Sequence, residues 1–291
     1  MSVEPLISVV IPVHNGAAFL SDALGSIAAQ THRRLDIVVV DDGSTDQSAA
    51  MIAWWAARDT RVHAIATRHR GAEHARNTGV AAARGDFIAH LDQDDIAVPA
   101  RLSTQYRWMQ ARGVDVCGSC TRVFGEHRYV RWVPERHPDI QREFVFRPAM
   151  IHSTTLLPAA IAKTHSFCED TQYGGYDLLT RLALRYRLGN VPKVLVKYRR
   201  HAAQRSQVKA DVVRADGGLI RRRYFFALFP AATPADYSAV MCLVDGVPFS
   251  GAAQMDLAAA WMRRLSDTGD PHLRSLMSDR WSAACACWNS E

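Results

Sequence analysis

Three carboxylates lie within four positions in the segment AHLDQDDIAVP (89–99). They are Asp92, Asp94 and Asp95, with Gln93 after the first, and they directly follow an apolar run. Like charges this close repel one another, and burial strengthens the repulsion. Clustered carboxylates are the ligands that hard divalent cations such as Mg²⁺ and Mn²⁺ prefer. The segment therefore predicts a divalent cation, which would offset the repulsion and neutralise a diphosphate leaving group.

Polar side chains also end two earlier buried runs. The run ISVVIPV is followed by His14 and Asn15, and the run LDIVVVDDGS carries Asp41 and Asp42. Ligands of open parallel sheets bind at the carboxyl ends of the strands. Three strands thus deliver polar groups to one edge, which favours a cation site over a solvated acidic turn, the usual explanation of an isolated D-x-D.

The elements that position these residues alternate along the first hundred residues. Strands are expected at 7–13, 35–44, 61–68 and 86–92, and helices at 17–30, about 45–58 and 72–85. This order predicts an α/β protein with a mainly parallel, Rossmann-like sheet and helices on both faces. Later segments predict a helix to about 112, a strand in VDVCGSCTRVFG with HRYVRWV as partner, a helix at 176–190 and a strand at 191–201.

From about residue 203 onward the pattern is helical. We expect an α/β domain at 1–205 and an α-helical C-terminal extension at 206–291. No apolar run approaches the ~20 residues of a membrane helix. The N-terminus lacks a basic region and a cleavage site, so we expect a cytoplasmic protein without a transmembrane segment.

Charge and cysteine content narrow the partners. The net charge of +6 suits a phosphate-bearing ligand or an anionic surface, but the basic residues are spread out and form no nucleic-acid-binding motif. Nucleic acid is therefore not an expected partner. The six cysteines lack zinc-site spacing and are expected to be free thiols.

Known binding fingerprints are absent: G-x-G-x-x-G does not follow the first strand, and no P-loop motif occurs. Four segments in order, SVVIPVHNG, IVVVDDGSTD, ARNTGVAAARGDFIAHLDQDD and YDLLTRLA with VPKVLVKYRRH, resemble the motifs of family 2 glycosyltransferases. The resemblance covers about residues 6–201. It implies the GT-A fold and an inverting, metal-dependent transfer of a sugar from a nucleotide-diphosphate sugar, most often a UDP-sugar.

The resemblance also implies roles for individual residues. The nucleotide would lie along Pro12, Val13, His14 and Asn15, the base would contact Asp41 and Asp42, and Arg76 and Gln93 would lie near the nucleotide sugar. Asp92 would contact ribose or metal, Asp94 would hold the metal, and His201 would reach the metal or the diphosphate. An imidazole ligand suits Mn²⁺ better than Mg²⁺. An ion pair of Arg76 with Asp92 or Glu73, and a solvated basic loop around His201, remain alternative interpretations.

One departure concerns the general base. The family usually carries E-D-Y-D-L, in which the acid pair precedes YDL and its Asp is the base, whereas this chain has Gly174-Gly175 there. A glycine cannot accept a proton. Glu169 and Asp170 could swing in on a hinged loop, Asp177 could take over from within the helix, or the acceptor could ionise without much help.

Three further questions stay open. The glycine pair also makes a catalytically impaired nucleotide-sugar-binding protein credible, and a nucleotidyltransferase is the weaker alternative because PVHNGAAF lacks its basic, glycine-rich loop. The acceptor, whether a glycan, a lipid-linked saccharide, a protein or a small molecule, is not encoded in any motif. The C-terminal helices could serve as an acceptor lid, a homodimer contact or a peripheral membrane face, with plain core packing as the common explanation.

Overall fold

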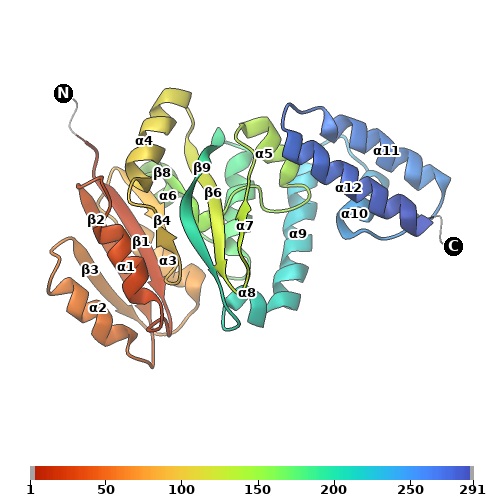
Figure 1. Ribbon diagram of the computed structural model, residues 1–291. Coiled ribbons are helices and arrows are strands. Elements are labelled where there is room, and N and C mark those ends of the chain that lie inside the picture. The colour runs from red at the N-terminus through yellow and green to blue at the C-terminus, as the bar shows by residue number, and fades with distance from the viewer. Residues whose placement is uncertain (1–3, 289–291) are drawn as a thin grey trace.

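The computed structural model describes residues 4–288 of the chain, in which one 9-stranded sheet is flanked by helices (Figure 1). The strands are β1 (Ile7–Val13), β2 (Leu35–Asp42), β3 (Val62–Thr67), β4 (Phe87–His90), β5 (Ile96–Ala97), β6 (Val116–Gly125), β7 (Tyr129–Arg131), β8 (Leu156–Pro158) and β9 (Leu188–Arg200). The helices of the α/β part are α1 (Leu20–Ala28), α2 (Ser48–Ala56), α3 (Ala72–Ala82), α4 (Arg101–Arg112), α5 (His137–Glu143), the 3₁₀ helix η1 (His152–Thr154), α6 (Ala159–Thr164) and α7 (Gly174–Ala183). The C-terminal helices are α8 (Arg205–Val208), α9 (Ala210–Leu228), α10 (Pro234–Asp245), α11 (Ala252–Ser266) and α12 (Pro271–Trp288).

The sheet order is β3-β2-β1-β4-β8-β6-β9-β5, with β7 paired to β6. The first four strands are parallel, as the sequence predicts, and so are β6 and β9. β8 lies antiparallel between β4 and β6, and β5 lies antiparallel to β9, so the second half of the sheet is mixed. The α/β fold class is confirmed, and the parallel half places the ends of β1, β2 and β4 at one edge.

One predicted helix boundary is wrong. The amphipathic helix expected at 176–190 ends at Ala183, and Gly189 and Asn190 belong to β9 instead. Gly189 pairs with Cys117 of β6, and a Cβ on Gly189 would lie 2.7 Å from the Trp108 ring. The buried Asn190 side chain donates to two carbonyl oxygens, at 2.7 and 3.0 Å. Residues that typically end a helix are here required by close packing within a sheet.

The core has one hydrophobic cluster on each face of the sheet. Helices α1, α2 and α4 cover one face, and α3, α6 and α7 cover the other. The second cluster continues without interruption into the C-terminal helices through Tyr224, Phe225 and Trp261. The aromatic stretch of α9 is thus largely core packing. Figure 1 shows α10, α11 and α12 grouped at the end of the molecule opposite β3. Within residues 4–288, none of the helices combines the length and apolarity needed to span a bilayer.

Asp36 ties the parallel strands together from within β2. Its side chain is buried and accepts from Ser8 Oγ at 2.6 Å, from the Arg84 backbone at 3.0 Å and from the Arg84 guanidinium at 2.8 Å. Burial alone would raise the pKa of Asp36, but the hydrogen bonds from Ser8 and Arg84 outweigh it, so the pKa lies below its usual value. The carboxylate therefore stabilises the fold only while it is ionised.

We expect the substitution Asp36→Ala to lower the free energy of unfolding by about 2–4 kcal/mol near pH 7, because Ser8 and Arg84 lose a buried charged acceptor. Because the folded-state pKa lies below the unfolded value, this contribution is fully present above the unfolded pKa of about 4. It is lost as the pH falls through the lower folded-state pKa. Urea unfolding at a series of pH values measures both effects. A constant difference between wild type and variant down to about pH 2 would contradict the assignment.

Candidate functional site at the carboxyl edge of the sheet

The loops that follow β1 and β4 are fastened to each other by Gln93. Its Oε1 accepts from the His14 backbone N–H at 2.8 Å, and its Nε2 donates to the His14 carbonyl at 3.1 Å. A Cβ on Gly16 would lie 2.5 Å from Gln93 Oε1, so a larger residue there would displace the Gln93 amide. Pro12 and Val13 are buried in the last part of β1. Gln93 thus fixes the position of the His14 backbone.

The loops after β1 and β2 are joined in a similar way. Asn15, which has a positive φ of 50°, accepts from the Thr45 backbone N–H at 2.8 Å through its side-chain oxygen. Its own backbone N–H donates to Ser44 Oγ at 2.9 Å. Asp41 accepts from the Ser44 backbone N–H at 3.0 Å. These bonds hold the two loops side by side at the carboxyl edge.

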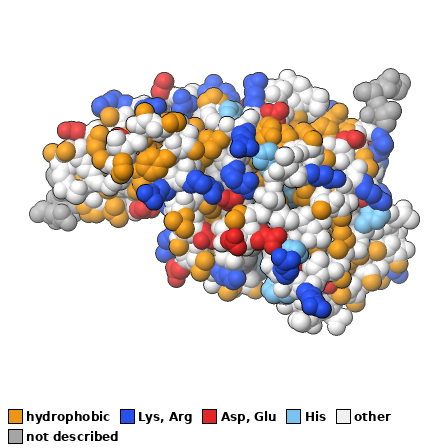
Figure 2. Space-filling model, turned by 180° about the vertical axis from the view of Figure 1, so that it is seen from behind, with side chains coloured by type: hydrophobic (Ala, Val, Ile, Leu, Met, Phe, Trp, Pro, Cys, Tyr) orange, Lys and Arg blue, Asp and Glu red, His pale blue; other side chains and the backbone are white. Residues whose placement is uncertain are grey.

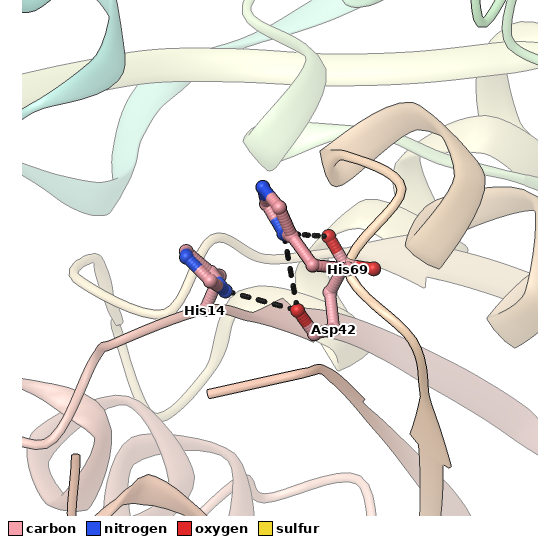
Figure 3. A group of neighbouring side chains, drawn as sticks. All are labelled: His14, Asp42 and His69. Atoms are coloured by element: carbon pink, nitrogen blue, oxygen red, sulfur yellow. Dashed lines mark hydrogen bonds and ion pairs between the residues drawn. The ribbon is translucent and has the colours of Figure 1, made fainter. Parts of the chain in front are cut away.

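His14, Asp42 and His69 form a compact group at this edge (Figure 3). The Asp42 carboxylate is buried and accepts the backbone N–H groups of Arg70 at 2.9 Å and Gly71 at 2.8 Å. His69 Nδ1 lies 2.9 Å from Asp42 Oδ2, and His14 Nδ1 lies 2.9 Å from the Asp42 carbonyl. The two imidazole rings stack with centroids 4.0 Å apart. His69 is not among the residues that the sequence predicts for the site.

The three acids that follow β4 have three different environments. Asp92 Oδ1 accepts from Arg76 at 2.9 Å and lies 3.3 Å from His152 Nε2, whereas Asp94 Oδ2 lies 2.9 Å from His201 Nε2. Burial raises the pKa of Asp92, but the charges of His152 and Arg76 outweigh it and hold the pKa well below its usual range. Burial and the charge of Asp92 together raise the pKa of Asp94.

Asp95 is the structural member of the three acids. It has no exposed surface and accepts from Ser153 Oγ at 2.8 Å and from the Arg199 backbone N–H at 3.0 Å. Burial and the charges of Asp94 and Asp92 raise its pKa well above the usual value. Asp95 thereby fixes the end of β9, from which His201 reaches Asp94.

Arg76 lies buried between two acids. It donates to Glu73 Oε1 at 3.1 Å and to Asp92 Oδ1 at 2.9 Å. This is the ion pair that the sequence offered as the alternative interpretation of Arg76. The arrangement links the first turn of α3 to the acidic loop.

The glycine pair at the start of α7 faces the same network. A Cβ on Gly174 would lie 2.5 Å from Glu73 Cγ, and a Cβ on Gly175 would lie 2.8 Å from His152 Cγ. Side chains from α3 and η1 therefore fill the space that an acid pair at these positions would need.

The three carboxylates considered as replacement bases lie elsewhere. Asp177 is buried, with Arg181 Nε 2.9 Å from one oxygen and the Arg223 guanidinium against the other. The bond to Arg223 joins α7 to α9. Glu169 bonds to Arg70 at 3.2 Å and His74 at 3.2 Å, while Asp170 is exposed. The geometry favours a structural part for Asp177 and a surface position for the other two acids. Figure 2 shows acidic, basic and histidine side chains gathered near the middle of the face opposite to that in Figure 1.

Two known proteins are similar in sequence to parts of this chain. GlyG of Streptococcus pneumoniae serotype 4 is 36% identical over 112 residues, which is 38% of this chain and 37% of GlyG. An uncharacterized glycosyltransferase of Haemophilus influenzae is 27% identical over 220 residues, 70% of this chain and 68% of that protein. The chain thus matches little more than a third of GlyG.

Solved structures share the fold. The TarS fragment 1–349 of S. aureus in complex with UDP-GlcNAc aligns with a TM-score of 0.65 at 17% identity, covering 97% of this chain and 84% of that one. The mannosyltransferase PcManGT from Pyrobaculum calidifontis, in complex with GDP-Man and Mn²⁺, aligns with a TM-score of 0.62 at 18% identity, covering 100% and 89%. The model of the family described as Glycosyl transferase family 2 matches residues 8–167, more than half of the chain, and the protein therefore belongs to that family.

Proposed function

We propose that this protein transfers a sugar, with inversion, from a nucleotide-diphosphate sugar to an acceptor hydroxyl, and that the donor is a UDP-sugar. The observation that carries the proposal is the carboxyl edge itself. Its loops are bonded to one another: Gln93, which lies between Asp92 and Asp94, accepts from the His14 backbone, and His14 bonds the Asp42 carbonyl. Structural neighbours that bind UDP-GlcNAc and GDP-Man support a nucleotide sugar as donor.

The nucleoside end of the donor is assigned to the group around Asp42. The stacked rings of His14 and His69 offer a flat aromatic surface for a base. A carboxylate such as that of Asp41 can accept the N3–H of uracil. The backbone of Pro12, Val13 and Asn15 borders this surface and would follow the nucleotide.

The diphosphate end of the donor is assigned to Asp94 and His201. Carboxylates and imidazoles are both groups that bind Mn²⁺, and Asp94 Oδ2 lies 2.9 Å from His201 Nε2. Burial and the charge of Asp92 raise the pKa of Asp94, and a bound cation would offset both effects. Asp94 and His201 would therefore hold a divalent cation, Mn²⁺ better than Mg²⁺. When bound, such a cation would neutralise the charge that develops on the nucleotide diphosphate. Arg76 and His152 orient Asp92 toward the same ligand.

A second candidate function is favoured by one specific observation. Gly174 and Gly175 replace the acid pair of the family, and Asp177 is held by two arginines. A nucleotide-sugar-binding protein without turnover would show the same features. Donor binding without any release of nucleotide distinguishes this candidate from the transferase.

The acceptor side is assigned to the C-terminal helices. Val212 and Leu219 of α9 are exposed, with 49% and 69% of their surface accessible. We propose that these helices form an acceptor lid or a homodimer contact beside the α/β part. The acceptor class, whether glycan, lipid-linked saccharide, protein or small molecule, is left open.

The substitutions Asp94→Asn and His201→Ala are expected to abolish the Mn²⁺-dependent part of the thermal stabilisation by UDP-sugars. They should lower kcat/KM by about 10²–10³-fold, because an electrostatic stabiliser of the leaving group is lost. Thermal shift with and without Mn²⁺, followed by nucleotide-release kinetics, measures both. His165→Ala, which removes an imidazole on α6 outside the site, serves as the control. Undiminished Mn²⁺ dependence in both site variants would overturn the metal assignment.

The substitutions His14→Ala and His69→Ala are expected to raise the Kd for UDP about tenfold each, since one stacking surface is worth roughly 1–2 kcal/mol. The value of kcat at saturating donor should change little. Isothermal titration with UDP and GDP measures the Kd and the base preference. The matched control is His272→Ala. It removes a histidine of α12 that stacks on Trp132. Equal Kd values in the wild type and both site variants would place the base elsewhere.

A further inference from the structure

Gly174 and Glu73 occupy a single shared space. They lie about a hundred residues apart in the chain, yet a Cβ added to Gly174 would lie 2.5 Å from Glu73 Cγ and 2.8 Å from Glu73 Oε1. Non-bonded carbon atoms do not approach this closely. An acidic side chain at 174 and a glutamate at 73 therefore exclude each other.

Glu73 cannot move aside easily. The atom that a Cβ would meet is Cγ, near the base of the side chain, and only 4% of Glu73 is exposed. Its carboxylate is also bonded to the buried Arg76 at 3.1 Å. The glycine at 174 is thus the residue that makes room for this particular carboxylate.

We propose that Glu73 is the general base of the transfer and takes over the task of the acid pair that α7 lacks. This inference rests on the proposed function. Among the acids considered, Asp177 is held by two arginines and Glu169 by Arg70 and His74. The carboxylate of Glu73 is also bonded to an arginine, Arg76, but it lies against Gly174, the first residue of α7, where the family places its acid pair.

The reaction step balances with Glu73 in this role. The acceptor hydroxyl gives its proton to the Glu73 carboxylate as its oxygen forms a bond to the anomeric carbon of the sugar. The bond from that carbon to the diphosphate oxygen breaks, and the electron pair leaves with the nucleoside diphosphate. The proton on Glu73 then passes to solvent.

Arg76 sets the position of the base relative to the donor. Its guanidinium bonds Glu73 on one side and Asp92 on the other, at 3.1 and 2.9 Å. The carboxylate that accepts the proton is thereby held at a fixed spacing from the acid assigned to the donor. The His152 ring is 17% exposed and lies beside Gly175, the second glycine of the pair.

The test compares three variants of the full-length protein. Glu73→Gln keeps the shape and a hydrogen-bond acceptor for Arg76 but cannot take a proton. Glu73→Ala combined with Gly174→Asp places a carboxylate on α7 in the space that Glu73 vacates, one position before the Asp that is the base in the family. Glu143→Gln is the matched control, because Glu143 is also a buried helical glutamate that pairs with an arginine, Arg147, at 2.9 Å.

The probe is nucleotide release, with water as acceptor, from the member of a UDP-glucose, UDP-GlcNAc and GDP-mannose panel that gives the largest thermal shift with Mn²⁺. Glu73→Gln is expected to lower kcat by about 10²–10⁴-fold with a donor Kd within threefold of wild type. The double variant should regain at least tenfold over Glu73→Ala alone. Glu143→Gln should retain the wild-type kcat.

Three results would overturn the proposal. A Glu73→Gln variant with kcat within threefold of wild type shows that another group is the base. A loss of donor binding that accounts for the whole decrease shows that Glu73 only positions Arg76. If Glu73→Gln fails to fold, Glu73→Asp replaces it, and an unchanged acidic limb of its pH–kcat profile counts against the proposal.

A wild type that binds donors without any turnover rejects the proposed transfer itself, whereas an active wild type with an active Glu73→Gln rejects only this inference.

Discussion

The crowding of negative charge after β4 is the constraint on which the rest of the site depends. Asp92, Asp94 and Asp95 lie within four positions of one another and are largely removed from water. Unpaired carboxylates in such a place are costly, so each needs a positive or hydrogen-bonding partner. The partners come from distant parts of the chain: Arg76 on α3, His201 beyond β9, and Ser153 on η1. The acids therefore determine where these three elements can lie.

This arrangement explains why the two halves of the sheet meet as they do. Asp95 accepts the Arg199 backbone N–H, and β5, which directly follows the acids, pairs with β9. The end of β9 is thereby brought next to the parallel half, although it lies beyond β8 and β6 in the strand order. Because the chain then turns at His201, the imidazole is delivered to Asp94. A structural acid thus positions a candidate ligand for its own neighbour.

The parallel half of the fold and its acid-tipped edge could be predicted from the sequence because the information is local. A short β-branched run reads as a buried strand, and the polar residues that follow it must lie at its carboxyl end. The sequence predicts a helix end at Gly189 and Asn190, but both residues belong to β9. Their place there depends on pairing with β6 and on contact with Trp108, which no local pattern reveals. His69 was missed for the same reason, since its partner Asp42 comes from another strand. Glu73 entered only as an ion-pair partner of Arg76, since its contact with Gly174 is purely tertiary.

The glycine pair then follows from electrostatics as well as from space. Arg76 already bonds two carboxylates, those of Glu73 and Asp92, in a region that solvent hardly reaches. A third carboxylate at 174 would lie against Glu73, beside a guanidinium that already pairs with two carboxylates. The chain can therefore carry an acid at position 73 of α3 or at position 174 of α7, but not at both. What a catalytic site must conserve is the position of a group in space and its partners, and these can be supplied from a different element of the fold.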